Sequence, residues 1–138
     1  MGEVFVGYPE APFFQEKEFV CKCGQCSKAL VSKELMYKLI VARYESQIPF
    51  VILSGCRCPP HNEKCGGQKA SDHLVVNPES SGEGLICTGV DILCTADRHR
   101  YIILKALLNA GIDRIGLNKD FIHAGLSQRN PPQVVWFY

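Results

Sequence analysis

One carboxylate lies in the middle of a segment that is otherwise apolar. Residues 85–93 are apolar enough to form a buried strand, and Asp91 falls within them. An unpaired charge in such a position is too costly to keep, so Asp91 needs a partner inside the fold. A bound metal ion would be one such partner, and an arginine such as Arg114 would be another. The chain must therefore fold so that a cation or a hydrogen-bond donor reaches this strand.

Two histidines on separate segments extend this pattern. His73 follows the dipeptide S-D, and His123 lies in the apolar segment D-F-I-H-A-G-L. Two histidines and one carboxylate are a candidate set of three protein ligands for a catalytic zinc, whose fourth position stays open for water. A lone histidine on an apolar strand is more often a satisfied core residue. The metal hypothesis therefore depends on His73, Asp91 and His123 together.

Helical and strand patterns place these residues in an α+β fold. The expected helices cover 33–46 and 96–110, and the expected strands cover 49–54, 85–93, 114–117, 121–126 and 134–138. Ser32 is the expected N-cap of the first helix, and Thr95 or Asp97 that of the second. Gly and Pro residues predict a shaped loop over 55–70, and turn-forming residues predict an exposed excursion over 77–84. The last three strands are expected to form an antiparallel sheet.

Eight cysteines are many for this length, and three of them form the cluster C-K-C-G-Q-C at Cys21, Cys23 and Cys26. Clusters at such short spacing, without a secretion signal, fit reduced thiols or metal ligands better than a disulfide framework. The three could hold a structural zinc. The possible fourth ligands are Cys56, Cys58, Cys65 and His61. The alternative is that they are packed thiols, because a single cluster lacks the second half of a paired zinc knuckle.

Composition excludes several other classes of protein. A chain of 138 residues fits one domain, with an irregular arm expected at 1–15. No apolar run approaches the ~20 residues of a membrane helix. The net charge is +1 with acids and bases interspersed, which argues against nucleic acid as a partner. The first residues lack the basic region and apolar core of a secretory signal. We therefore expect a monomer made in the cytoplasm, with no membrane or nucleic-acid partner.

Five motifs in a fixed order carry a family resemblance. They are S-G-C-R-C-P-P-H-N, S-D-H, T-G-V-D-I, R-I-G and D-F-I-H, followed by a late tryptophan. Over roughly residues 16–138 the chain resembles the M15 family of zinc peptidases that cut bacterial peptidoglycan stems, and most closely its small phage-associated branch. The resemblance implies an α+β fold of the hedgehog and D,D-peptidase type. It has a small antiparallel sheet, helices packed on one side, and zinc at the open face.

The same resemblance assigns roles to individual residues. It implies that His73, Asp91 and His123 bind zinc, that Asp120 is the general base, and that Arg57 orients the substrate. Two features depart from the family. Eighteen positions separate His73 from Asp91, where relatives have only a few, and Gly125 stands where many relatives in this branch carry an acid two positions after the late histidine.

The function implied is hydrolysis of a peptidoglycan stem peptide that contains a D-residue. Both a D,D-carboxypeptidase and an L-alanyl-D-glutamate endopeptidase fit, because each substrate offers a carboxylate near the scissile bond. Without a signal peptide, the enzyme would reach the cell wall after release or in a phage particle. The alternatives are a catalytically silent zinc-binding module on the same fold and a virion component that docks to the wall.

Overall fold

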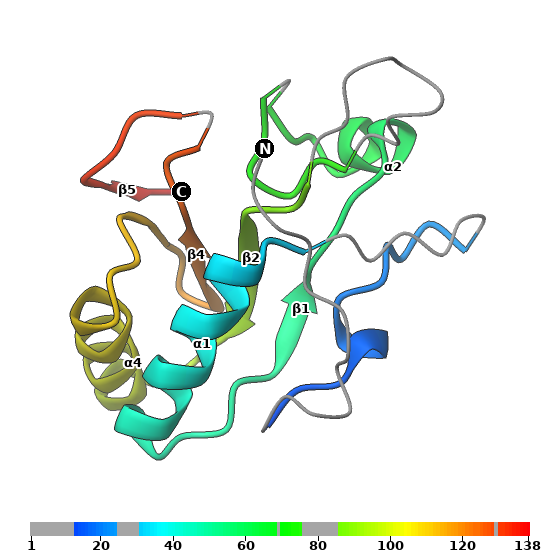
Figure 1. Cartoon of the computed structure of the whole chain (residues 1–138). Helices are drawn as coiled ribbons and strands as arrows, with labels where there is room; N and C mark the ends of the chain where they lie inside the picture. Colours follow the sequence, from blue (N-terminus) through cyan, green and yellow to red (C-terminus); the bar gives the residue numbers. More distant parts are fainter. Residues whose placement is uncertain (1–12, 25–30, 69, 76–85, 129) are drawn as a thin grey trace.

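The computed structural model describes residues 13–24, 31–68, 70–75, 86–128 and 130–138. The 77–84 excursion, Cys26 and most of the expected N-terminal arm lie outside these residues. The fold is α+β, as predicted, with one five-stranded sheet and two longer helices that lie together across one of its faces (Figure 1). None of the helices in the described part of the chain is long and apolar enough to cross a membrane.

The two longer helices begin and end close to where the sequence predicts. Helix α1 covers Lys33–Ser46, and Ser32 Oγ accepts a hydrogen bond from the Leu35 backbone N–H at 3.3 Å, as an N-cap does. Helix α4 covers Asp97–Asn109, but its N-cap is Ala96, so the prediction of Thr95 or Asp97 is wrong. Asp97 is instead the first residue of α4, and its carboxylate accepts a hydrogen bond from Arg100.

The sheet has the strand order β1-β2-β4-β3-β5. Its strands are β1 (Ile52–Ser54), β2 (Gly89–Leu93), β3 (Arg114–Leu117), β4 (Phe121–Gly125) and β5 (Val134–Phe137), and the short 3-10 helix η2 (Glu16–Glu18) precedes α1. Strands β1, β2, β4 and β3 pair antiparallel to their neighbours. The two strands that carry Asp91 and His123 are therefore hydrogen-bonded to each other in the interior of the sheet.

Strand β5 corrects the expectation of a purely antiparallel sheet, because it pairs parallel to β3. Both edges of β4 are occupied, one by β2 and the other by β3. The chain that leaves β4 can therefore extend this side of the sheet only at the outer edge of β3. It crosses over through 126–133 and then runs in the same direction as β3, which makes the sheet mixed.

A short helix corrects the prediction of a loop over 55–70. Helix α2 covers Pro59–Lys64, with Cys58 as its N-cap residue. Two prolines at the first helical positions are compatible with this start, because their fixed φ suits a helix and the missing N–H groups have no intrahelical partner there. A helix of six residues has no repeating apolar stripe, so the hydrophobic period gave no sign of it.

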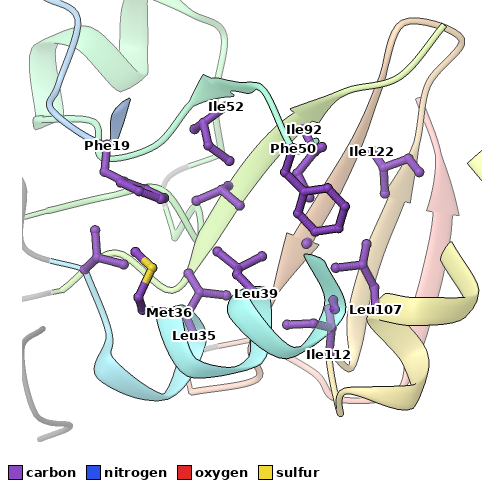
Figure 2. Packing of buried hydrophobic residues seen from close by; sticks show 14 of the residues in the cluster. Phe19, Leu35, Met36, Leu39, Phe50, Ile52, Ile92, Leu107, Ile112 and Ile122 are labelled. Carbon is purple, nitrogen blue, oxygen red and sulfur yellow. The ribbon is translucent and has the colours of Figure 1, made fainter. Parts of the chain in front are cut away.

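Alternation along the central strands separates the core from the opposite face of the sheet. Ile92 and Ile122 are fully buried and point toward α1 and α4, where they pack with residues such as Leu39 and Leu107 (Figure 2). Neighbouring residues in a strand point to opposite faces, so Asp91 and His123 lie on the face away from these helices. The hydrophobic core thus supports the sheet from one side and leaves the other side for a site.

Candidate metal centre

A row of residues crosses the face of the sheet opposite the helices. The register pairs Ser54 with Asp91, Asp91 with His123, His123 with Gly116, and Gly116 with Trp136. Directly paired residues in neighbouring strands share a face, so this row places the carboxylate and the imidazole side by side. Strand pairing alone therefore fixes two of the three predicted metal ligands.

His73 reaches the same point from the loop before β2. Its backbone is held by a short parallel bridge in which Arg57 N–H donates to the His73 carbonyl and Val75 N–H donates to the Arg57 carbonyl, both at 2.8 Å. On the other side, Thr88 N–H donates to the Asp72 carbonyl at 2.8 Å. These bonds anchor both flanks of the 76–85 connection, so the long spacing between His73 and Asp91 does not separate the two side chains.

The three predicted ligands form one buried group, with a ligand atom from each lying within 4.8 Å of the others. His73 Nε2 is 3.2 Å from Asp91 Oδ1, and His123 Nδ1 is 2.9 Å from the same oxygen. All three side chains are almost fully shielded from solvent. The structure thus brings His73, Asp91 and His123 together in an arrangement that could bind a metal ion.

Each histidine makes a hydrogen bond through the ring nitrogen that faces away from Asp91, and this bond indicates which nitrogen carries the proton. His73 Nδ1 lies 2.7 Å from the Gly55 carbonyl, which can only accept, so Nδ1 carries the proton and the Nε2 lone pair faces Asp91. His123 Nε2 lies 2.9 Å from Asp72 Oδ2, which leaves the Nδ1 lone pair facing Asp91. With both rings neutral, lone pairs from three residues converge on one point. A cation at that point satisfies all of them, which is the donor set that zinc requires.

Without a metal ion, the charges of the centre favour a proton on His123 in place of the cation. Burial lowers the pKa of His73, because it disfavours the charged ring. Burial acts in the same direction on His123, but hydrogen bonds and charges from Asp72 and Asp91 outweigh it and raise the pKa. Burial alone would raise the pKa of Asp91, yet the two histidines hold it below its usual value. A metal ion would therefore replace a proton that His123 otherwise holds between two carboxylates.

Asp72 is a member of this centre to which the sequence analysis gave no role. Its Oδ2 accepts from His123 Nε2 and, at 3.0 Å, from Arg114 Nε, and its Oδ1 accepts from Asn130 Nδ2 at 2.8 Å. Burial opposes ionisation, but these donors outweigh it and lower the pKa of Asp72 to about 2. A carboxylate on the outer nitrogen of a ligating histidine fixes the ring and raises its basicity. The only available signal was its place in the S-D-H motif.

Glycines provide the space that this second carboxylate occupies. A Cβ atom on Gly125 would lie 2.5 Å from Asp72 Oδ2, and one on Gly89 would lie 2.5 Å from the Asp72 Cβ. Both glycines lie beside the His123 ring, where the same added atoms would approach to 3.0 Å or less. The Asp72 carboxylate therefore fills the position that a side chain at 125 would need, which explains why this chain has glycine there.

Each of the two arginines pairs with a different carboxylate. Arg57 donates through Nη2 to Asp91 Oδ2 at 3.3 Å and through Nε to Ser54 Oγ at 3.0 Å. Arg114, the partner considered for Asp91 in the absence of metal, pairs with Asp72 instead. The centre is thus surrounded by positive charge that balances the two carboxylates, and Arg57 lies directly beside the candidate ligands.

A cleft of about 790 Å³ opens over the centre. Its wall includes both arginines and the aromatic side chains Phe121, Trp136 and Tyr138. The Trp136 ring lies 5.3 Å from the His123 ring, and Tyr138 packs 5.0 Å from Phe121, measured between centroids. The cleft therefore combines cationic groups for an anionic ligand with aromatic surfaces for an extended chain.

Asp120, the predicted general base, lies apart from this group. Its side chain is exposed in the turn before β4, and it is not among the residues that line the cleft, although Asn118 and Phe121 on either side of it are. Its backbone N–H donates to Asn118 Oδ1 at 2.9 Å. Its role in catalysis stays a prediction.

The cysteine cluster is only partly the predicted one. Cys21 and Cys23 lie together with Cys58, and their sulfur atoms are within 4.8 Å of one another. Cys58 was one of the possible additional ligands, whereas Cys26 lies outside the described residues. This second group shares no residue with the His73–Asp91–His123 centre, although Cys58 directly follows Arg57 in the sequence.

Comparison with known proteins connects the centre to one family. The family model of Peptidase M15 matches residues 12–124, which include the three candidate ligands, Arg57 and Asp72. Neither the curated proteins nor the solved structures contain a significant match to the chain. The match covers most of the sequence and agrees with the α+β fold and the buried His-Asp-His group. The chain belongs to the peptidase M15 family.

Proposed function

We propose that the protein is a zinc-dependent peptidase that cleaves peptidoglycan stem peptides containing D-residues. The observation that carries this proposal is the convergence of lone pairs from His73, Asp91 and His123 beneath an open cleft with a cationic wall. Three protein ligands with an accessible fourth side are typical of catalytic zinc, whereas structural zinc is usually enclosed by four. Family membership supports peptidase chemistry, and the peptidoglycan substrate is part of the proposal.

Zinc bound by these three residues would lower the pKa of a water ligand and polarise the scissile carbonyl. Around it, the chain's own residues hold the reacting groups in place. Asp72 keeps His123 in the tautomer that presents Nδ1, and the Gly55 carbonyl does the same for Nε2 of His73. Fixed ring orientations matter, because small misplacements of ligands cost much of the rate.

Arg57 is suited to bind a carboxylate of the substrate. Two of its nitrogens are used by Ser54 and Asp91, and within the described residues Nη1 makes no hydrogen bond. An Arg whose other donors are already fixed loses little further side-chain entropy when it binds a ligand. A stem peptide carries a carboxylate near either candidate scissile bond, and its charge would be matched by Arg57 at the wall of the cleft.

Asp120 is the proposed proton-transfer group, from a position at the margin of the cleft. It would accept a proton from water and return it to the leaving amine, a role typically worth ~10²–10⁴-fold in rate. Because its carboxylate is exposed in a turn, the side chain has to move toward the cleft when substrate is bound. Catalytic hydrogen bonds are often longer in free enzymes than in complexes, which is consistent with such a movement.

The test is digestion of defined stem peptides by zinc-loaded protein, with products identified by mass spectrometry. Release of terminal D-Ala would identify a D,D-carboxypeptidase, and cleavage between L-Ala and D-Glu would identify an endopeptidase. His123→Ala should abolish cleavage, whereas His99→Ala, which changes an exposed histidine on α4, should not. Cleavage of neither bond by protein that contains zinc would contradict the proposal.

One observation favours a second candidate, a zinc-binding module without turnover. The predicted base does not line the cleft, so the centre can bind metal and peptide while lacking a proton acceptor. Such a module would bind stem peptides with a measurable affinity and release no new amines. Asp120→Asn discriminates between the two, because it would reduce turnover of an enzyme and leave the peptide affinity of a silent module unchanged.

A further inference from the structure

We propose that Cys21, Cys23 and Cys58 bind a second metal ion, a structural zinc that is separate from the His73–Asp91–His123 centre. This site does not depend on peptidase activity. Its ligands come from two segments far apart in the sequence, the turn at 21–24 and the loop before α2. The metal would therefore fasten the N-terminal segment to the part of the chain that carries Arg57.

The sulfur positions already fit a zinc site. All three sulfur atoms lie within 4.8 Å of one another. In a tetrahedral site with Zn–S bonds of ≈ 2.3 Å, sulfurs are about 3.8 Å apart. Cys21 and Cys58 are buried and Cys23 is partly exposed, so small rotations of the side chains bring the three to bonding distance. Three thiolates leave one coordination position for a further donor.

A backbone N–H group points at one of these sulfurs. The Cys58 N–H donates to Cys21 Sγ at 3.3 Å. Hydrogen bonds to sulfur favour the thiolate, which is the form that binds metal. An amide donor beside a cysteine sulfur is an outer-shell contact of the kind that metal sites use.

Close backbone contact holds the two segments in this position. The Cys56 N–H donates to the Phe19 carbonyl at 2.9 Å, and a Cβ on Gly55 would lie 2.8 Å from the Phe19 Cα. Lys22 Nζ, between two of the cysteines, donates to the Leu53 carbonyl at 2.9 Å. The segments therefore meet through main-chain groups, and the sulfur cluster does not depend on flexible side chains alone.

The turn after Cys23 has the form that such a site needs. Gly24 has a φ of 78°, a left-handed conformation that glycine adopts without strain. This conformation places a turn directly after the second cysteine. This glycine gives the C-x-C-G motif a structural reason beyond the spacing of its cysteines.

The position of the site connects it to the cleft. Cys58 directly follows Arg57, whose guanidinium contacts Asp91, and the Arg57 backbone pairs with the segment that carries His73. A metal at Cys58 would fix the end of the loop that positions both residues. This one expectation rests on the proposed function: loss of the metal should raise KM for a peptide more than it lowers kcat.

Metal content separates this site from the first one. Protein purified in buffered zinc is analysed by inductively coupled plasma mass spectrometry, together with His123→Ala, Cys58→Ser and the double variant. We expect two zinc ions in the wild type, one in each single variant and none in the double variant. Cys94→Ser is the matched control, because Cys94 is also buried but lies outside the cluster. Equal zinc in the wild type and in Cys58→Ser would overturn the proposal, whatever His123→Ala shows.

A measurement on the wild type covers the case in which Cys58→Ser does not fold. Protein refolded with Co²⁺ in place of zinc should show the near-ultraviolet sulfur-to-metal charge-transfer band that only thiolate ligands produce. Absence of this band overturns the proposal, as does a disulfide between two of the three cysteines in non-reducing peptide mapping.

Discussion

At the scale of single residues, three members of the metal centre can be predicted from the sequence and a fourth, Asp72, cannot. Asp91 and the two histidines are visible in the sequence, because a carboxylate or an imidazole in an apolar segment requires a partner. Asp72 is not visible in this way, because neighbours in a regular strand point to opposite faces. Here the chain turns at residues 71–74, so Asp72 and His73 both reach the centre. No local pattern predicts that turn.

Loss of the Asp72 charge should weaken metal binding. Asp72→Asn removes the carboxylate that accepts from His123 Nε2, and changes of this kind typically cost ~10–100-fold in metal affinity. Competition with a fluorescent zinc chelator measures the affinity. Asp97→Asn, at an exposed carboxylate on α4, is the control and should leave it unchanged. An unaltered affinity in Asp72→Asn would show that the hydrogen bond does not support the ligand.

An acid at position 125 should be incompatible with Asp72. Its Cβ would lie 2.5 Å from Asp72 Oδ2, so Gly125→Asp alone should destabilise the fold by ~1–3 kcal/mol through overpacking and like charge. Adding Asp72→Gly vacates that space and should recover most of the loss. Urea unfolding of the two single variants and the double variant tests this coupling. Additive effects in the double variant would mean that the two positions do not share one site.

Acid should destabilise the metal-free protein through the same carboxylate. The pKa of Asp72 is about 2 in the fold, below its ordinary value of 3.8. A carboxyl group with a lowered folded pKa stabilises the fold above the unfolded pKa and loses this effect as the pH falls toward the folded one. Stability should therefore decrease between about pH 4 and pH 2, and less so in Asp72→Asn. Urea titrations in the presence of a chelator provide the measurement; identical pH profiles would contradict it.

At the scale of helices and strands, periodic segments were predictable and short or long-range features were not. Helices α1 and α4 follow clear apolar spacing, and their bounds match within a residue. Helix α2 has no such spacing, because it is short and begins with two prolines. The direction of β5 depends on which edge of the sheet is free after β4 has been placed, and its own residues do not encode this. That direction brings Trp136 alongside His123.

The contribution of β5 to the cleft can be tested through Trp136, which lies in the cleft wall. Trp136→Ala removes the ring that lies 5.3 Å from His123 and forms part of the cleft wall. We expect KM for a peptide substrate to rise about tenfold, corresponding to ~1.4 kcal/mol, with zinc content unchanged. Val135→Ala, on the opposite face of the same strand, is the matched control. An equal effect of both substitutions would point to general loosening of the strand.

At the scale of the whole molecule, the helices and the metal centre lie on opposite faces of one sheet. The family resemblance anticipated this arrangement, because the order of its motifs places Asp91 and His123 on strands and leaves the two helical patterns to cover the other face. It did not anticipate the mixed sheet, and the sequence left Cys58 as one of four possible partners for the cluster at Cys21. Both depend on contacts between segments that are distant in the sequence.

Metal binding at this sheet should stabilise the entire fold. Two of the metal-binding residues belong to the central strands, and the third lies in a loop fastened to those strands. Because only the folded protein brings the three together, a bound metal ion stabilises the folded state. Free zinc at a hundred times Kd contributes ~2.7 kcal/mol, or about 10 °C in Tm for a chain of this size. Differential scanning calorimetry of wild type and His123→Ala at equal zinc isolates this centre. A shift of the same size in both would assign the effect to other sites.

Hydrogen bonds on both flanks of the 76–85 connection have a consequence for how such enzymes diversify. Val75 N–H is bound to the Arg57 carbonyl and Thr88 N–H to the Asp72 carbonyl, so the ends of the connection are fixed independently of its length. Each doubling of loop length costs only about 0.6 kcal/mol. Evolution can therefore lengthen, shorten or replace this connection while the chemistry beside it is preserved, and a protein engineer could graft a recognition loop at the same place.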